Sequence, residues 1–197
     1  MSTSEALPRL NVVIASTRPG RIGHVIGAWF AAAATSHGGF DVRVVDLAEL
    51  NLPFHDEPGQ PVDGGPYAHE HTRRWSEATD AADAFVFVMP EYNRGYSAPL
   101  KNALDYLYRE WHHKPAGFVS YGMSSAGMRA VEQLKPVLGA LRMVPLAESV
   151  NIGLRQAVAD DGTFTPSAPT RAAAQGMLDE LRLIAELMSA ARIEVRA

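Results

Sequence analysis

Two stretches of the chain are too short for a typical helix: residues 10–15 (LNVVIA) are nearly continuously apolar, and residues 84–89 (AFVFVM) are continuously apolar. This pattern predicts strands that are buried on both faces of a sheet. Residues 40–44 instead alternate apolar and charged side chains, which is typical of a strand with one exposed face. The first two stretches are therefore expected at the centre of a sheet, and the third at an edge.

Two further strands are predicted, at residues 116–121 and within 143–152. Pro145 favours an edge position for the last one, because proline cannot donate a hydrogen bond to a neighbouring strand. Strands that alternate with helices pair in parallel through right-handed crossovers. The expected fold is therefore an α/β three-layer sandwich with a five-stranded parallel sheet in the order 2-1-3-4-5. Such a sheet binds ligands beyond the carboxyl ends of strands one and three.

Between the strands, apolar residues recur every three or four positions, which predicts helices with one buried face. Gly38 is expected to end the first helix, Ser97 to cap the third, and Pro136 to kink the fourth. The expected helices cover about residues 22–37, 67–82, 97–111, 127–141 and 171–192. The loop at residues 47–66 is rich in proline, glycine and aspartate, and it is long enough to suggest a role of its own.

The composition is that of an ordinary globular domain. The 197 residues are 47% hydrophobic and 20% charged, so we expect one domain over residues 1–197, with residues 1–8 flexible. A net charge of -4 gives no general attraction for nucleic acid or for an anionic membrane. The chain has no cysteine, no signal peptide and no stretch that approaches a membrane span. We therefore expect a soluble, cytoplasmic protein without nucleic-acid or membrane partners.

The sequence ASTRPGRIG, residues 15–23, lies between the first strand and the first helix. Its hydroxyls, guanidinium groups and glycines, placed before a helix N-terminus, favour an anion. The alternative is a plain turn, in which Ser16 or Thr17 caps the helix and the arginines are solvated. The chain contains neither G-x-x-x-x-G-K-[ST] nor G-x-G-x-x-G, so the usual triphosphate and dinucleotide loops are excluded.

A second unusual sequence, PEYNRGYSAPLKNALDYL at residues 90–107, begins where the third strand ends. Tyr92 and Tyr96 offer flat apolar faces, and Asn93 offers both a donor and an acceptor, which suits a planar heterocycle. The alternative is that the tyrosines pack in the core and the loop only turns. A third sequence, YGMSSAGMRA at residues 121–130, adds donors at the exit of the fourth strand.

These three sequences together resemble the motifs of the NADPH-dependent FMN reductase family of flavodoxin-like proteins, over nearly the whole chain. The resemblance implies a flavodoxin-like fold with FMN at the ends of strands one, three and four. It implies NADPH or NADH as the reductant, and quinones, azo dyes, metal oxyanions or free flavins as small-molecule electron acceptors. It also implies a homodimer or a tetramer, with FMN near the subunit interface.

The resemblance assigns cofactor-binding roles by position in these motifs. The residues concerned are Ser16, Thr17, Arg18, Ile22, Gly23, Pro90, Glu91, Tyr92, Asn93, Gly95, Gly122 and Ser125. The first five would hold the FMN phosphate, the next five would border the isoalloxazine ring, and the last two would reach its far edge. Ala15, where glycine is usual, and Ala126, within a usual serine-glycine-glycine run, depart from the pattern. No catalytic side chain is nominated, because the flavin itself accepts the hydride.

Other functions are weighed against this one. A flavin-binding electron carrier without NAD(P)H oxidase activity would have the same fold, although the modest net charge favours an enzyme. The sequence GMSSA resembles the G-x-S-x-G elbow of serine hydrolases, but all seven histidines precede Ser124, in the wrong order for that fold. No metal site is expected from His69 with His71 or from His112 with His113, because neighbours two apart on a helix do not share a face.

Overall fold

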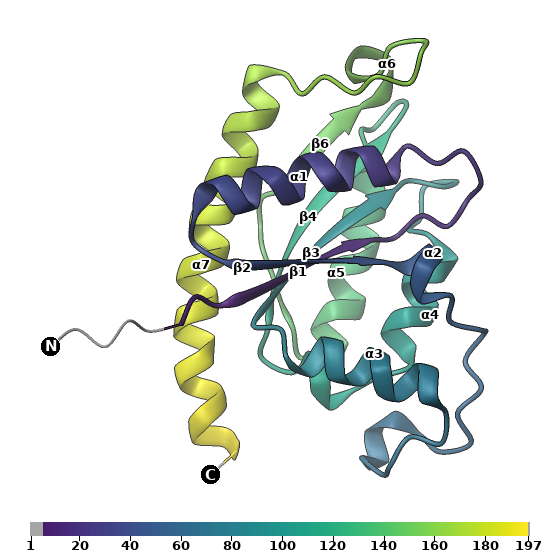
Figure 1. Ribbon diagram of the computed structural model, residues 1–197, viewed down its shortest axis with the longest axis vertical. Coiled ribbons are helices and arrows are strands. Elements are labelled where there is room, and N and C mark those ends of the chain that lie inside the picture. Colours follow the sequence, from purple (N-terminus) through teal and green to yellow (C-terminus); the bar gives the residue numbers. More distant parts are fainter. Residues whose placement is uncertain (1–5, 197) are drawn as a thin grey trace, which may run out of the picture.

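The structure, a computed structural model, describes residues 6–196 and the side chains of residues 6–189, so the first five residues of the segment expected to be flexible lie outside it. A parallel sheet forms the centre of the molecule, with helices on both faces (Figure 1). Its strands are β1 (Arg9–Ile14), β2 (Asp41–Asp46), β3 (Ala84–Pro90), β4 (Pro115–Gly122), β5 (Val144–Pro145) and β6 (Val150–Gly153). The order β2-β1-β3-β4-β5 confirms the predicted flavodoxin-like α/β topology.

The predicted last strand is divided in two. β5 pairs with Pro115 and Ala116 of β4, whereas β6 pairs with residues 119–122 of the same strand. Pro145 has no N–H to donate, and after Leu146 donates to the Ala116 carbonyl (2.9 Å) the chain leaves the sheet until Val150. The sheet therefore has six strands rather than the five expected, although the edge position of this segment is as predicted.

The predicted helices are all present, with some shifted ends. The longer helices are α1 (Gly23–His37), α3 (Glu70–Asp80), α4 (Ala98–Asp105), α5 (Met128–Ala140) and α7 (Ala168–Arg196). Short helices add α2 (Leu47–Leu50), α6 (Leu154–Ala157) and the 3₁₀ turns η1 (Pro61–Asp63) and η2 (Arg109–Trp111). α4 thus ends before the expected limit at Trp111, whereas Gly38 ends α1 in a left-handed conformation, as predicted.

Alternate residues of the central strands enter two separate hydrophobic cores. Phe85 and Phe87 of β3 pack with α3, α4 and α5, and Val86 and Val88 pack with α1 and α7 on the opposite face. The burial of β1 and β3 on both faces confirms the prediction that the two apolar stretches form central strands. β2 is partly exposed along its length, as expected of an edge strand.

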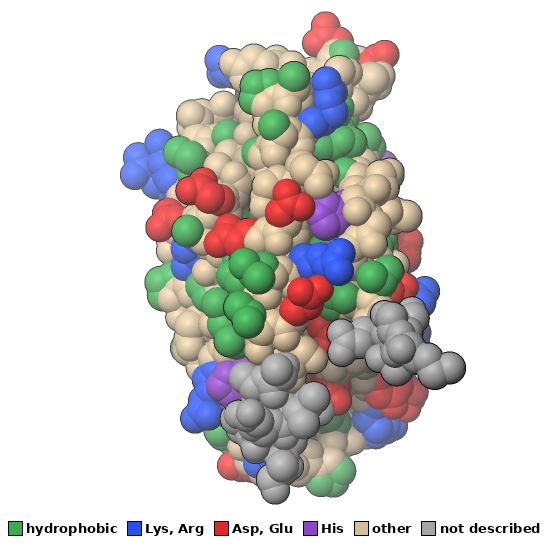
Figure 2. Space-filling view, turned by 90° about the vertical axis from the view of Figure 1, so that its left-hand side faces the viewer, with side chains coloured by type: hydrophobic (Ala, Val, Ile, Leu, Met, Phe, Trp, Pro, Cys, Tyr) green, Lys and Arg blue, Asp and Glu red, His purple; other side chains and the backbone are tan. Residues whose placement is uncertain are grey.

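The side of the molecule on which α7 lies carries acidic, basic and hydrophobic side chains that are interspersed rather than gathered by kind (Figure 2). Within residues 6–196, none of the helices is both long and apolar enough to cross a membrane.

Candidate functional site

The segment that leaves β1 forms a shallow depression in front of α1. Its volume is about 320 Å³, and it is lined by Thr17, Arg18, Pro19, Gly20, Arg21 and His24. The N-cap position of α1 is Ile22, and no side chain caps the helix there. The alternative in which Ser16 or Thr17 caps α1 is therefore wrong. An uncapped helix N-terminus presents backbone N–H groups and a partial positive charge, both of which favour an anion.

The two arginines of this segment have different surroundings. Arg21 forms an ion pair with Asp46 at the end of β2 (Nη2 to Oδ2, 2.5 Å) and donates to the Ser16 carbonyl (3.2 Å). Asp46 in turn accepts from the Ala48 backbone N–H (2.9 Å) and caps α2. Arg21 therefore holds the loop between β1 and α1 to the end of β2, whereas Arg18 is exposed on the wall of the depression.

Ser16 lies beneath the depression rather than on its wall. Only 1% of the residue is exposed, and its hydroxyl lies 2.8 Å from that of Tyr92, which follows β3. The buried Tyr121 hydroxyl, near the end of β4, has no hydrogen-bond partner within the described part of the chain. A Cβ atom at Gly23 would lie 2.5 Å from that hydroxyl, so glycine is required for this close approach. Burial raises the pKa of Tyr121, and the nearby Ser16 acts in the opposite direction, so the phenol is neutral.

The segment that follows β3 is a tight turn at the surface. Tyr92 and Gly95 exchange two backbone hydrogen bonds of 2.9 Å, with Asn93 and Arg94 at positive φ between them. This is the geometry of a two-residue hairpin turn. Asn93 and Arg94 are exposed at its tip, and 42% of Tyr92 is exposed. The alternative in which the tyrosines are simply core residues is therefore wrong for Tyr92, whereas Tyr96 packs against the core.

Ser97 does not cap α4 as expected. It occupies the N-cap position, but its hydroxyl donates to the Ala15 carbonyl (2.7 Å) instead. Ser97 is buried, and the folded sheet brings the Ala15 carbonyl within reach of its hydroxyl. This bond holds the start of α4 to the β1 exit.

The segment that follows β4 is joined to the β3 exit. The Ser125 hydroxyl donates to the Glu91 carboxylate, and the Glu91 backbone N–H donates to the Tyr121 carbonyl (3.0 Å). A Cβ atom at Gly122 would lie 3.1 Å from the Gly127 nitrogen, so the segment is tightly packed there. Glu91 and Ser125, which the resemblance assigns to FMN, thus contact each other.

The structure brings the three predicted strand exits together at one edge of the sheet. Among the predicted residues, Thr17, Arg18, Tyr92 and Asn93 are exposed, Ile22, Glu91, Gly95 and Ser125 are partly exposed, and Ser16, Gly23, Pro90 and Gly122 are buried. The prediction did not include Arg21, His24 or Tyr121. Arg21 was visible as a second guanidinium in the same sequence, but nothing in the sequence indicates the bond between the hydroxyls of Ser16 and Tyr92.

A larger groove also contacts Thr17 and lies between α4, α2 and the loop that follows α2. Its volume is about 580 Å³, and it is lined by Thr17, Leu47, Ala48, Asn51, Leu52, Pro53, Phe54, Ala98, Pro99, Asn102 and Ala103. The Phe54 side chain stands at its rim and is 86% exposed. The predicted loop at residues 47–66 therefore forms one wall of a groove beside the phosphate-binding candidate.

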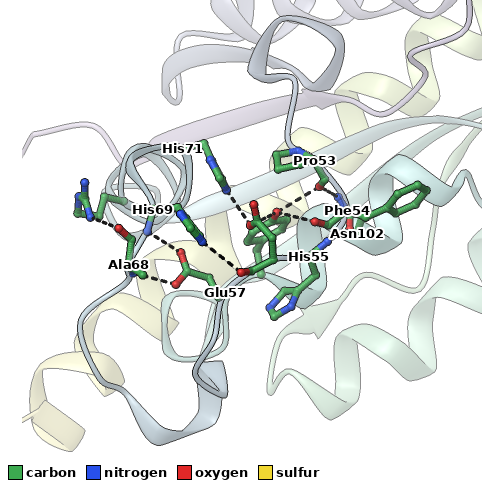
Figure 3. Close-up of polar contacts among 11 residues, drawn as sticks. Pro53, Phe54, His55, Glu57, Ala68, His69, His71 and Asn102 are labelled. Carbon is green, nitrogen blue, oxygen red and sulfur yellow. Dashed lines mark hydrogen bonds and ion pairs between the residues drawn. The ribbon is translucent and has the colours of Figure 1, made fainter.

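Helices α3 and α4 hold this loop in place (Figure 3). Asn102 donates to the Pro53 carbonyl (2.6 Å) and accepts from the His55 backbone N–H (3.0 Å). Asp56 accepts from the Tyr106 hydroxyl (2.9 Å) and contacts Nε2 of His71 (3.0 Å). The loop is thus fixed at its backbone, while the Phe54 side chain remains exposed.

The expectation that His69 and His71 point apart is wrong. Their rings stack, with centroids 5.2 Å apart, because His69 is the N-cap of α3 with extended backbone angles rather than a helical residue. Both contact Asp56, His69 through the backbone carbonyl (3.1 Å). Among the residues with described side chains, no three His, Asp or Glu form a group that could hold a metal ion.

The residues at the sheet edge fit FMN on three grounds. The uncapped α1 N-terminus and the exposed Arg18 suit a phosphate dianion. The buried Tyr121 hydroxyl beside Gly23 is a polar atom without a partner in the described structure. The exposed aromatic face of Tyr92 and the turn beside it suit a flat ring.

Comparison with known proteins agrees with this geometry. Residues 8–156 match the model of the NADPH-dependent FMN reductase family. An NAD(P)H-dependent FMN reductase of Schizosaccharomyces pombe is 44% identical over 137 residues, which cover 69% of this chain and 68% of that protein. One of Saccharomyces cerevisiae is 46% identical over 107 residues, and the match spans 52% of this chain and 56% of that relative.

Among solved structures, the flavoenzyme NAD(P)H:(acceptor) oxidoreductase FerB of Paracoccus denitrificans has a similar fold. The TM-score is 0.72 at 23% sequence identity, over 92% of this chain and 99% of that one. The family match covers the strands and loops that form the sheet edge described above. The chain belongs to the NADPH-dependent FMN reductase family.

Proposed function

We propose that this protein is an oxidoreductase that uses NADPH or NADH to reduce a small electron acceptor, of the quinone, azo, metal-oxyanion or flavin class, with FMN at the carboxyl edge of the sheet. The observation that carries the proposal is the uncapped N-terminus of α1 beside the exposed Arg18. FMN supplies a centre that accepts a hydride from one substrate and passes electrons to another. The protein binds the flavin, orients it toward the substrates and adjusts its electronic properties through nearby charges and hydrogen bonds.

The phosphate of FMN would lie in the depression in front of α1. Arg18 and the Thr17 hydroxyl are placed to bind it, with the backbone N–H groups near Ile22 and Gly23 at the helix N-terminus. Ser16 would support this subsite from below through its bond to Tyr92. Arg21, engaged with Asp46, would keep the loop in shape rather than neutralise the phosphate.

The isoalloxazine ring would lie beside the turn after β3, bordered by Pro90, Tyr92, Asn93 and Gly95. The N–H groups of Tyr92 and Gly95 are used within the turn, and that of Glu91 pairs with β4. The N–H groups of Asn93 and Arg94 take no part in the bonds that close the turn, so they are the better candidates to stabilise negative charge on the reduced ring. Gly122 and the residues that follow it would border the far edge of the ring.

Hydride transfer through a flavin needs no protein acid or base, so the side chains act by position and electrostatics. If NAD(P)H and the acceptor use the same open face of the ring, they bind in turn, and the kinetics are ping-pong. Mixing FMN-loaded protein with NADPH or NADH without oxygen tests the proposal. Bleaching of the flavin absorbance supports a reductase, and a flavin that stays oxidised with both reductants identifies an electron carrier instead.

We also infer that two copies of the chain form a homodimer, or pairs of dimers a tetramer, through the groove beside Thr17. The support is an apolar groove with the exposed Phe54 at its rim, because exposed apolar surface is one mark of a protein–protein interface and aromatic residues are enriched there. Light scattering of the wild type and of Phe54→Ser tests this. A wild-type monomer, or a variant with an unchanged mass, contradicts it. We place the reaction in the cytoplasm, because it consumes NAD(P)H.

A further inference from the structure

The Glu91 carboxylate is fully engaged within the protein. It accepts a hydrogen bond from the Ser125 hydroxyl, one from the Arg129 backbone N–H (3.2 Å to Oε2), and one from the Arg129 guanidinium (3.2 Å to Oε1). Only 8% of its side chain is exposed, against 44% for Arg129. Three donors from the segment after β4 and from α5 thus meet one carboxylate from the segment after β3.

Glu91 takes the place of a local helix cap. The N-cap of α5 is Gly127, at φ 88°, which has no side chain to offer. A larger residue does not fit there, since a Cβ atom would lie 2.6 Å from that of Ser120. Arg129 is the second residue of α5, so its N–H is one of the donors that a helix leaves unpaired. Glu91 satisfies that donor from another loop and places a negative charge at the N-terminus of the helix, where the dipole favours it.

The charge of Glu91 is stabilised where it lies. Burial acts to raise the pKa of Glu91, but the hydrogen bonds from Ser125 and Arg129, with the charge of Arg129, outweigh it and hold the pKa below its usual value. The carboxylate is therefore ionised and paired at neutral pH. A group in this state has little capacity left for a flavin ring, because three of its roughly four acceptor positions are already occupied.

We propose that Glu91 is a positioning residue, which fixes the segment at residues 122–127 against the β3 exit and thereby determines how tightly the isoalloxazine ring is held. This inference rests on the proposed function. Glu91 borders the ring site in the sequence, but it acts through Ser125 and Arg129 rather than by contact with the flavin. Without the carboxylate, α5 loses its cap and the loop after β4 loses the bond that orders it.

The test compares two flavins by fluorescence titration: FMN, and riboflavin, which has the same ring without the phosphate. Glu91→Ala is expected to lower the affinity for both flavins by the same factor of about 10, which corresponds to about 1.4 kcal/mol of binding free energy. Arg18→Ala should lower the affinity for FMN but not for riboflavin, because it removes a phosphate contact. Glu91→Gln, which retains the acceptor oxygen for Ser125 and the Arg129 N–H, should recover most of the lost affinity.

Glu132→Ala is the matched control, since Glu132 lies on the same helix, is 70% exposed and pairs only with Lys135 in the described structure. It should bind both flavins as the wild type does. Ser125→Ala removes one bond of the cluster and should weaken both flavins less than Glu91→Ala. Hydrogen exchange at residues 122–129 should quicken in Glu91→Ala and not in Glu132→Ala.

Three results overturn the inference. The first is a Glu91→Ala variant with a lower unfolding midpoint but unchanged affinity for both flavins, which would make Glu91 a helix cap only. The second is a loss confined to FMN, which would place Glu91 at the phosphate. The third is wild-type protein that binds neither flavin, which overturns the proposed function and this inference with it.

Discussion

The hydroxyl oxygens of Ser16 and Tyr92 lie 2.8 Å apart and join the exit of β1 to the exit of β3 across 76 positions of sequence. Ser16 is buried beneath the phosphate-binding candidate, and Tyr92 is partly exposed beside the ring-binding candidate. The bond thus couples the two halves of the proposed FMN site. It also lies next to the buried hydroxyl of Tyr121.

A double-mutant cycle measures this coupling. Ser16→Ala, Tyr92→Phe and the double variant each remove the bond while they retain most of the packing. We expect a coupling of about 1 kcal/mol in the free energy of unfolding, which is typical of one hydrogen bond between neutral groups. Urea unfolding of the four proteins gives the value. Strictly additive effects of the two single substitutions would show that the two hydroxyls do not interact.

Arg18 should contribute to FMN affinity through the phosphate. Arg18→Ala removes one charge-assisted hydrogen bond, so FMN should bind roughly 10- to 100-fold more weakly. The stability of the protein should change little, because Arg18 is exposed. The measurement is a fluorescence titration with FMN. Arg43→Ala serves as the control, since Arg43 is also exposed but lies on the edge strand β2. Equal FMN affinity in all three proteins would remove Arg18 from the site.

The sequence was sufficient for the parts of the fold that depend on local pattern. The apolar runs at residues 10–15 and 84–89 became β1 and β3, and the alternating residues 40–44 became the edge strand β2. These predictions succeed because a strand buried on one face has alternating apolar and polar residues, and a strand buried on both faces has a continuous apolar run. The three unusual loops could be located as well, since parallel strands end at the same edge of the sheet.

Contacts between distant residues could not be predicted in the same way. Ser97 fits the composition of a helix cap, but its hydroxyl bonds to Ala15, which only the folded sheet brings near. Glu91 and Ser125 both fit a flavin-binding motif, and the motif does not reveal that they bind each other. The short polar side chains at strand exits have several possible partners, and tertiary packing selects among them.

Lys114 provides a test of the fold away from the site. It is almost completely buried, and its ammonium group donates to the carbonyls of Thr79 (2.7 Å) and Asp80 (2.9 Å) at the end of α3. Lys114→Met should destabilise the protein by roughly 2–3 kcal/mol, because it removes charged donors from a helix C-terminus.

Lys101→Met is the comparison for Lys114, because Lys101 forms an exposed ion pair with Asp105 (2.5 Å) within one helix. That pair should contribute no more than about 0.5 kcal/mol. Chemical unfolding of the wild type and of both variants measures these two losses of unfolding free energy. Similar small losses in both would mean that Lys114 does not cap α3. Neither substitution should alter FMN affinity, because both residues lie outside the proposed site.

The loop that carries Phe54 should loosen in acid. Burial acts to raise the pKa of Asp56, but hydrogen bonds from Tyr106 and His71 outweigh it and leave the pKa below its usual value. The same balance lowers the pKa of Glu57, which accepts from the backbone N–H groups of Ala68 (2.8 Å) and His69 (3.1 Å). A carboxyl group with a lowered pKa in the folded state stabilises that state above its unfolded pKa, and the stabilisation is lost as the pH falls through the folded pKa.

The hydrogen-exchange protection factors of residues 53–69, relative to those of β3, should therefore be steady near neutral pH and fall once the pH drops below the usual range of carboxyl groups. In Asp56→Asn and Glu57→Gln the loop should exchange faster already at neutral pH, because the neutral amides lose the charge-assisted part of these bonds. Their exchange should then respond less to acid than that of the wild type. If the loop and β3 respond to acid in parallel, global unfolding rather than these two carboxylates governs the change, since β3 is buried in the core and the ion pair of the loop joins Asp56 to His71 of α3.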